Sequence, residues 1–187
     1  MGRVRSDASL NRQRILDAAR AAFAEQGADA SMAEVVRRSG LGAATLYRNF
    51  GSRQALLEAL LLDEVDELCA AAGGVEGATA RDRLVTWLRR FFGYVTTERP
   101  VVLDLLVVED ADTTQLKIST RRRLIMAGGP LLAAAQDADE VRRDLDLEQV
   151  VDLVMAVAKI SGAPSYRQPI FDAALDGLRP GHQPPPV

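Results

Sequence analysis

Apolar residues recur along most of the chain at intervals of three and four positions, which is the spacing of one buried helix face. The first such stripe predicts a helix over residues 10–27, with Gly27 in the left-handed position that commonly ends a helix. The polar residues 1–9 before it are expected to form a flexible arm. The apolar positions of this stripe are Ile15, Leu16, Ala19, Ala22 and Phe23.

Two short helices joined by a glycine-containing turn are predicted next. Ser31 and Glu34 have the spacing of a capping box, in which a hydroxyl and a carboxylate bond free backbone amides at the start of a helix. We expect that helix to end at residues 39–42 and a second one to cover residues 43–50, with Leu46 and Phe50 on its buried side. Such a pair is the signature of a helix-turn-helix, whose second helix enters the major groove of DNA.

The remaining chain continues the helical pattern. Gly51 should interrupt the second short helix, and Ser52 should cap a long helix through residue 68, with Gly73 and Gly74 marking its end. No alternating strand pattern or hairpin turn is found, so an all-α fold is expected. Further helices are predicted over residues 80–97, 100–108, 115–136, 147–160 and 166–178.

Composition agrees with a helical protein, and charge separates two parts of the chain. Hydrophobic residues make up 48% but aromatic residues only 5%, which favours helices over a sheet. The formal net charge is -3, yet residues 1–62 hold nine arginines against six acidic residues, whereas the rest of the chain holds 14 basic against 20 acidic residues. A basic end on an acidic body indicates that only the first part meets a polyanion.

Several kinds of site are excluded or disfavoured by single residues. Cys69 is the only cysteine and His182 the only histidine, so an intrachain disulfide is impossible and a Cys/His zinc site is nearly so. Nucleophile–base pairs are scarce for the same reason, and we expect neither an enzyme nor a cofactor. No apolar run approaches the ~18–20 residues that span a membrane, which predicts a cytoplasmic protein with no membrane partner.

Five motifs are spaced over residues 10–62: RILDAA at 14–19, SM at 31–32, SGL at 39–41, TLYRNF at 45–50 and SRQALL at 52–57. In this combination they resemble the TetR/AcrR family of bacterial regulators. The resemblance implies an N-terminal three-helix helix-turn-helix DNA-binding domain over residues 10–55 and a C-terminal helical ligand-binding and dimerisation domain over residues 56–178. Residues 179–187 are then a disordered tail.

The resemblance also implies roles for individual residues. Thr45, Tyr47 and Arg53 are expected to contact phosphates, and Arg48 is expected to grip guanine O6 and N7. The residues of the turn and second helix that are expected to face DNA are Gly42, Ala43, Ala44, Thr45, Tyr47, Arg48 and Asn49.

The chain departs from the family at positions 42 and 43, where members commonly carry Ser followed by Lys or Arg. Gly42 can still cap the second helix, but Ala43 lacks a long polar side chain. Specificity is therefore expected to depend on Arg48, on methyl contacts and on DNA shape.

Each of three residues at the ends of the first short helix has two alternative roles. Ser31 either offers its hydroxyl to a phosphate or only caps the helix. Arg37 and Arg38 either contact phosphates or are solvated cations that favour the negative end of the helix dipole.

In the acidic body, aromatic and apolar residues at helical spacing are either walls of a ligand pocket or ordinary core. Arg121 and Arg123 are expected to pair with a buried carboxylate of the protein or of an anionic ligand, or else belong to a solvated run. The expected apolar walls are Trp87, Phe91, Phe92, Tyr94, Leu105, Met126 and Met155.

The leading functional hypothesis is a homodimeric repressor that a small-molecule effector releases from a palindromic operator in duplex DNA. The resemblance implies that the last two helices form the dimer, and residues 147–160 are apolar on more than one side, as a helix between two cores would be. Two alternatives remain: a DNA-binding protein controlled by a protein partner, and a helical enzyme that retains a helix-turn-helix.

Overall fold

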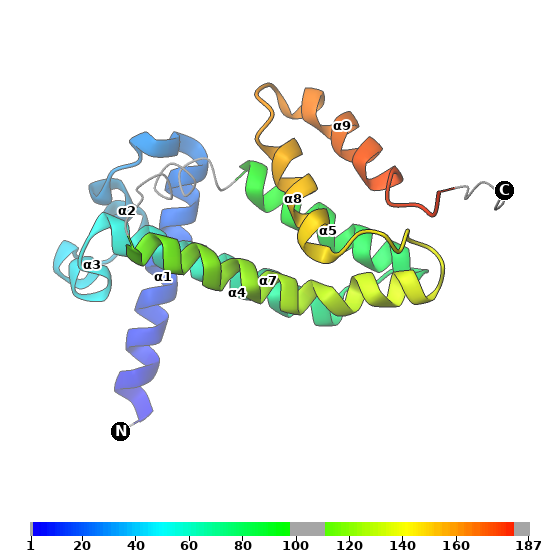
Figure 1. Cartoon of the computed structure of the whole chain (residues 1–187). Helices are drawn as coiled ribbons and strands as arrows, with labels where there is room; N and C mark the ends of the chain where they lie inside the picture. The colour runs from blue at the N-terminus through cyan, green and yellow to red at the C-terminus, as the bar shows by residue number, and fades with distance from the viewer. Residues whose placement is uncertain (1, 98–110, 182–187) are drawn as a thin grey trace, which may run out of the picture. The chain divides into compact units, whose positions relative to one another are not determined.

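A computed structural model describes residues 2–97 and 111–181, and all regular structure in these ranges is helical (Figure 1). The all-α prediction is therefore confirmed. The predicted helix over 100–108 lies outside the described residues. The elements are α1 (Gly2–Gln26), the 3-10 turn η1 (Gly27–Asp29), α2 (Met32–Ser39), α3 (Ala43–Phe50), α4 (Arg53–Gly74), α5 (Ala80–Thr97), α7 (Ala111–Asp137), α8 (Leu147–Ala158) and α9 (Pro164–Asp176).

The chain forms two compact units. The N-terminal unit contains α1 to α3, α4 as far as Glu64, and the described residues of Thr97–Ile118; the C-terminal unit contains α4 from Val65, α5, the rest of α7, α8 and α9. The division therefore falls inside α4, whereas the predicted domain boundary followed residue 55. The helix has no break near residue 55 that could separate two domains there.

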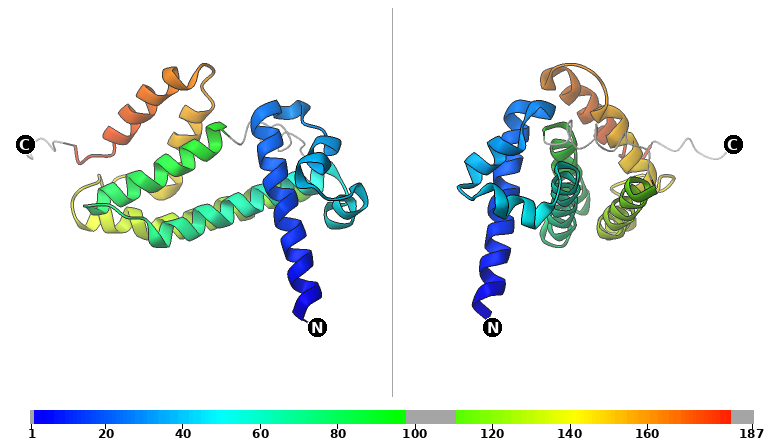
Figure 2. Two further views of the ribbon diagram at one scale, coloured as in Figure 1. Left: turned by 180° about the vertical axis from the view of Figure 1, so that it is seen from behind. Right: turned by 90° about the vertical axis from the view of Figure 1, so that its left-hand side faces the viewer.

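The first helix is longer than predicted. α1 begins at Gly2, so the described residues 2–9, which were expected to form a flexible arm, are helical. None of residues 3–9 is Gly or Pro, and nothing in that stretch interrupts the backbone hydrogen bonds of the helix. Within the N-terminal unit, the first turns of α1 project beyond α2 and α3 in every view (Figures 1 and 2).

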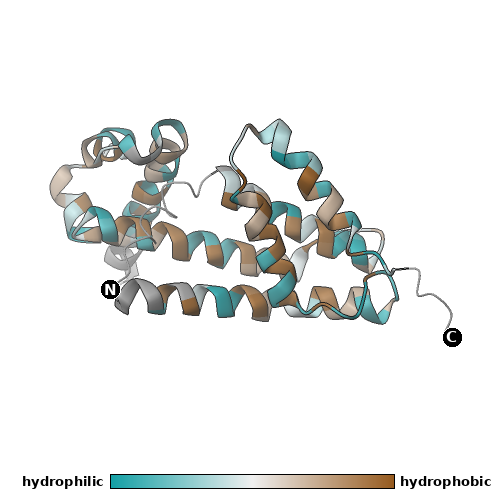
Figure 3. Cartoon of the chain, turned by 45° about the horizontal axis from the view of Figure 1, so that its top comes forward, coloured by the Kyte–Doolittle hydropathy of each residue, from teal (hydrophilic) through white to brown (hydrophobic). Residues whose placement is uncertain are grey.

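The core of the N-terminal unit is formed by the predicted stripe of α1 and by one face of each short helix. Hydrophobic and hydrophilic segments alternate along these helices, as Figure 3 shows. α2 contributes Val35, while Met32 and Val36 are only half-buried. The fully or nearly fully buried side chains include Ile15, Leu16, Ala19, Ala22, Phe23, Val35, Leu46 and Phe50, together with Leu56, Leu57, Leu60 and Leu61 of α4.

The C-terminal unit packs around aromatic residues of α5. The indole N–H of Trp87 donates to the carbonyl of Leu68 at 3.0 Å, which satisfies the polar atom of an otherwise buried ring. Phe92 stacks on Phe171 of α9, with ring centroids 3.9 Å apart. α7 contributes Gly128, which lies so close to the Trp87 ring that a Cβ atom there would be 2.5 Å from ring carbon Cη2.

Candidate nucleic-acid interface

The turn between α2 and α3 is fixed by backbone conformation and by one arginine of α1. Gly40 has a φ of 65°, in the left-handed region that residues with side chains rarely adopt, and it ends α2. The guanidinium of Arg14 donates to the carbonyl of Ser39 at 3.0 Å, and the Ser39 hydroxyl donates to the carbonyl of Val36 at 3.0 Å. These bonds satisfy carbonyl groups at the end of α2.

α3 has the predicted bounds and the predicted buried side. Leu46 and Phe50 are 0% and 4% exposed, and Gly51, with a φ of 57°, ends the helix. Gly42 is the N-cap residue, and its carbonyl accepts the amide of Thr45 at 2.9 Å. The second helix is thus held by its apolar side with its opposite side in solvent.

The residues predicted to face DNA fall into two groups. Ala43, Ala44 and Arg48 are exposed, and Tyr47 is 50% exposed. Thr45 and Asn49 are half-buried, and the Asn49 side-chain amide donates to the Thr45 carbonyl at 2.8 Å. That bond lies within α3, so the orientation of Asn49 is set by its own helix.

Arg53, predicted as a phosphate contact, has partners inside the N-terminal unit. Its guanidinium donates to the carbonyl of Ala30 and lies over the ring of Phe23, 5.0 Å from the centroid. A similar cation–π contact joins Arg12 to Phe50, at 4.7 Å. Sequence reasoning missed the contacts of Arg12 and Arg14, because no short-range pattern relates residues on α1 to partners on α2 and α3.

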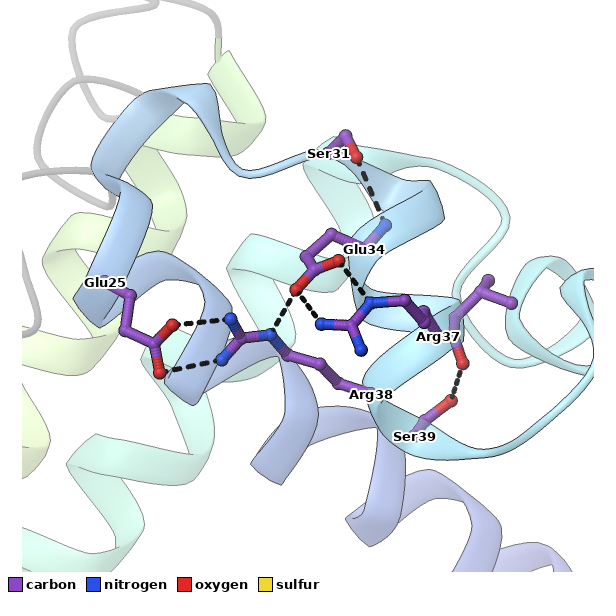
Figure 4. Close-up of polar contacts among 7 residues, drawn as sticks. Glu25, Ser31, Glu34, Arg37, Arg38 and Ser39 are labelled. Carbon is purple, nitrogen blue, oxygen red and sulfur yellow. Dashed lines mark hydrogen bonds and ion pairs between the residues drawn. The ribbon is translucent and has the colours of Figure 1, made fainter.

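At the start of α2, half of the predicted capping box is present. The amide of Glu34 donates to the Ser31 hydroxyl at 3.1 Å, so Ser31 is the N-cap. The Glu34 carboxylate is directed at two arginines of the same helix (Figure 4). It accepts from Nε and Nη2 of Arg37 at 2.8 and 2.6 Å, and from Nε of Arg38 at 2.6 Å.

Arg38 also reaches α1, where Nη1 and Nη2 donate to the two carboxylate oxygens of Glu25 at 2.9 and 2.5 Å. The hydrogen bonds from Arg37 and then Arg38 lower the pKa of Glu34 from 4.5 to about 2. The bond from Arg38 likewise lowers the pKa of Glu25. These four residues form the α1–α2 charge network, defined as Glu25, Glu34, Arg37 and Arg38, whose formal charges cancel.

Two sequence profiles match the chain. One, described as bacterial regulatory proteins of the tetR family, matches residues 15–60; the other, described as the C-terminal domain of SbtR-like transcriptional regulators, matches residues 79–180. The second match alone covers more than half of the 187 residues. The chain belongs to the TetR family. The resemblance seen in the helix-turn-helix motifs is thereby confirmed.

Individual TetR relatives agree with this assignment. The chain is similar to the TetR transcriptional regulator SCO0520 from Streptomyces coelicolor, with a TM-score of 0.75 and 33% identity over 91% of this chain and 99% of that one. A TetR regulator from Mycobacterium vanbaalenii gives 0.74 and 30%, over 94% and 99%. UidR of Escherichia coli K12, an HTH-type transcriptional regulator, is 30% identical over 108 residues, which are 57% of this chain and 55% of UidR. The chain thus matches about half the length of its curated relatives.

In the TetR C-terminal unit, the predicted aromatic walls are buried. Trp87, Phe91, Phe92 and Tyr94 are each 7% exposed or less. Met126, at 69% exposed, does not lie in the interior because it points outward from α7. Two other predicted wall residues are Leu105, which lies outside the described residues, and Met155, which is half-buried.

The two predicted arginines of α7 pair with carboxylates of the protein. Arg121 donates to both oxygens of Asp152 at 2.7 and 3.1 Å, and Arg123 pairs with Asp66. The side chains of Asp152 and Asp66 are 63% and 57% exposed, so these pairs fit the alternative of a solvated run and not that of a buried carboxylate. Arg122 is exposed.

Two surface hollows of about 500 and 530 Å³ lie in the C-terminal unit, and none of the predicted wall residues lines either. Residues of the α7–α8 connection line the larger part of the first, and Thr79, Arg81 and Asp82 line part of the second. Across residues 2–97 and 111–181, no group of three or more His, Cys, Asp or Glu could hold a metal ion. No helix there is long and apolar enough to cross a membrane. Burial raises the pKa of the Cys69 thiol.

Proposed function

We propose that the chain is a DNA-binding transcriptional regulator that reads duplex DNA with the exposed side of α3. The observation that carries this proposal is the division of α3 into a buried side, with Leu46 and Phe50, and a solvent side with Tyr47 and Arg48. A helix-turn-helix places the second helix in the major groove, with its N-terminal residues near base edges. Membership of the TetR family supports the same function.

Each exposed residue of α3 has a role that its chemistry suits. Arg48 can donate two hydrogen bonds to guanine O6 and N7, which makes it the best residue for base readout. Tyr47 can donate its phenolic hydroxyl to a phosphate. Ala43 and Ala44 are small and exposed, which allows close approach to the groove and contact with thymine methyl groups. Arg53, at the start of α4, has a structural role as well, because it donates to the carbonyl of Ala30 in the segment before α2.

The test is a gel-shift titration of purified protein with duplexes enriched from a random library by the unaltered chain. Arg48→Ala should lose about 1–3 kcal/mol of binding free energy on enriched duplexes and less on random ones, because a base contact is lost. Tyr47→Ala should weaken binding to both. Arg122→Ala, which removes an exposed arginine of α7, serves as the matched control and should leave binding unchanged. Enrichment of no sequence, or an Arg48→Ala variant that binds normally, would contradict the proposal.

We infer further that the regulator is a homodimer formed through α8 and α9. One side of α9 carries Tyr166, which is 62% exposed, the half-buried Ile170 and the exposed Ala173, and the C-cap residue Gly177 continues this row at intervals of four, three and four residues. On α8, Leu153 is 36% exposed and Ala156 is exposed beside it on the same side. Small residues between larger apolar ones allow two helices to approach closely, and a two-fold protein suits a palindromic operator.

The family supports a repressor in the cytoplasm that a small-molecule effector releases from its operator. The effector would bind in the C-terminal unit. It would favour a spacing of the two helix-turn-helix units of the dimer that no longer fits successive major grooves. The buried aromatic side chains of α5 are the apolar surface that such a site would use. Titration of the protein–duplex complex with a panel of small aromatic and carboxylic acids, followed by gel shift, tests this part of the proposal.

A further inference from the structure

The α1–α2 charge network lies on the helix that, in a helix-turn-helix, crosses the DNA backbone. A basic residue there would ordinarily add to the attraction for phosphates. The side chain of Arg37 is 69% exposed, yet Glu34 already binds it through two parallel hydrogen bonds. A carboxylate that binds a guanidinium in this way occupies the same donors that a phosphate would use.

Glu34 is itself held in place. Its Oε1 atom accepts from Nε of Arg38, whose two remaining nitrogens are bound by Glu25 of α1. The side chains of Glu34 and Arg38 are only 17% and 19% exposed, so this part of the network is shielded from solvent. Arg38 therefore links α1 to α2, and it positions the carboxylate that binds Arg37.

The two arginines, which the sequence could not separate, thus have different surroundings. Arg38 has carboxylate partners for all three nitrogens, whereas the bound Arg37 faces solvent and has Nη1 directed away from Glu34. Arg37 is the one whose partner a DNA phosphate can replace without separating α1 from α2.

We propose that Glu34 competes with DNA phosphates for Arg37 and so sets the sequence-independent part of the affinity for DNA. The inference rests on the proposed function, because it concerns how strongly the same helix-turn-helix binds a duplex. In the free protein the network is neutral, and Glu34 opposes the contact of Arg37 with a phosphate when DNA is bound. Glu34 thereby limits the part of the affinity for DNA that does not depend on base sequence.

The experiment measures the affinity of the full chain for a random duplex and for an enriched duplex over a range of salt concentrations. Glu34→Gln should bind both duplexes more tightly by similar factors, roughly three- to tenfold at moderate salt. The slope of log K against log salt should be steeper by about 0.9, the value for one added phosphate contact. The gain should disappear in the double variant Glu34→Gln, Arg37→Ala.

Glu58→Gln is the matched control, because it removes the same charge from α4 and retains an acceptor for the side chain of Gln54. It should change neither affinity nor slope. Glu25→Gln, at a residue that is 62% exposed, weakens the hold on Arg38 and should give a smaller gain than Glu34→Gln. This second variant tests the same network without altering α2.

An unchanged affinity and slope in folded Glu34→Gln, or a gain that persists without Arg37, would overturn the inference while leaving the proposed function intact. If the unaltered chain binds neither duplex, the proposed function fails, and this inference fails with it.

Discussion

Glu34 and Gln149 occupy the same position, the third residue of a capped helix, yet their side chains bond different groups. At the start of α8, the side-chain oxygen of Gln149 accepts from the backbone amide of Asp146 at 2.9 Å. The backbone amide of Gln149 donates to the Asp146 carboxylate at 2.8 Å, so the capping box is complete. At the start of α2, the carboxylate of Glu34 pairs with Arg37 and Arg38 instead. Bonds between ionised groups are stronger than a bond to a backbone amide, which accounts for the difference.

The low pKa of Glu34 predicts a pH-dependent contribution to stability. Because the folded state lowers the pKa from 4.5 to about 2, the carboxylate stabilises the fold fully above the unfolded value. That contribution should decrease as the pH falls below about 4.5 and should be lost near pH 2. Unfolding by urea at several pH values should therefore show the unaltered chain more stable than Glu34→Gln at neutral pH, with the difference shrinking in acid.

The glutamine variant has no carboxyl group to titrate at position 34. Its stability at each pH is therefore the baseline against which that of the unaltered chain is compared. A stability difference that stays constant from neutral pH to about pH 2 would mean that the network does not lower the pKa of Glu34. Because Glu34 remains ionised at physiological pH, a moderate fall in pH should not release Arg37.

At the scale of helices, sequence periodicity predicted the bounds of α3 and α5 and the buried sides of α1 and α3. The start of α1 was missed because its first residues have no apolar stripe, although none of residues 3–9 would break a helix. The partners of Arg14 and Arg53 could not be predicted, since each bonds a backbone carbonyl more than 20 positions away. Spacing within one helix carries no information on such contacts.

Two neighbouring glycines of α7 should respond in opposite ways to alanine. A Cβ atom at Gly128 would lie 2.5 Å from Cη2 of Trp87 and 2.9 Å from Cδ2 of Leu147, whereas a Cβ at Gly129 meets nothing within 4 Å. Alanine favours a helix over glycine by about 1 kcal/mol, so Gly129→Ala should raise the free energy of unfolding by up to that amount. Gly128→Ala should lower it by roughly 1–3 kcal/mol because the core is overfilled.

Chemical denaturation followed by circular dichroism compares the two glycine variants directly. Each variant controls for the other, since both replace glycine within the same turn of α7. Equal changes of the same sign in the free energy of unfolding of both variants would mean that helix propensity alone accounts for them. The close approach of Gly128 to Trp87 would then not exclude a Cβ atom.

At the scale of the whole molecule, the sequence predicted an all-α protein of two parts but not where they divide. The resemblance placed the boundary after residue 55, and Gly73 and Gly74 indicated one at the end of the long helix, whereas the two compact units share α4 and divide between Glu64 and Val65. A continuous helix leaves no change in composition at such a point. Periodicity also could not distinguish the walls of a ligand pocket from ordinary core, because aromatic residues at helical spacing line a core and a cavity with the same pattern.

The proposed dimer can be tested by placing a charge on the solvent side of α9. Ala173→Glu should convert the dimer to a monomer, because two carboxylates would be desolvated against each other at a close helix approach. Ala133→Glu, at an exposed position of α7, introduces the same charge elsewhere and should leave the mass unchanged. Sedimentation velocity or light scattering measures the mass. An unaltered chain that is monomeric, or an Ala173→Glu variant that remains dimeric, would contradict the proposal.

The buried indole of Trp87 provides an intrinsic fluorescence probe of the C-terminal unit. It is the only tryptophan in the sequence, it is 1% exposed, and its N–H is bound to Leu68 within the C-terminal unit. Its fluorescence emission therefore registers solvent entry into that unit alone, while far-ultraviolet circular dichroism registers helix throughout. Heating curves recorded by the two signals coincide if the units unfold as one cooperative block and separate if they do not. Cooperativity between the two units can thus be measured without attaching a label.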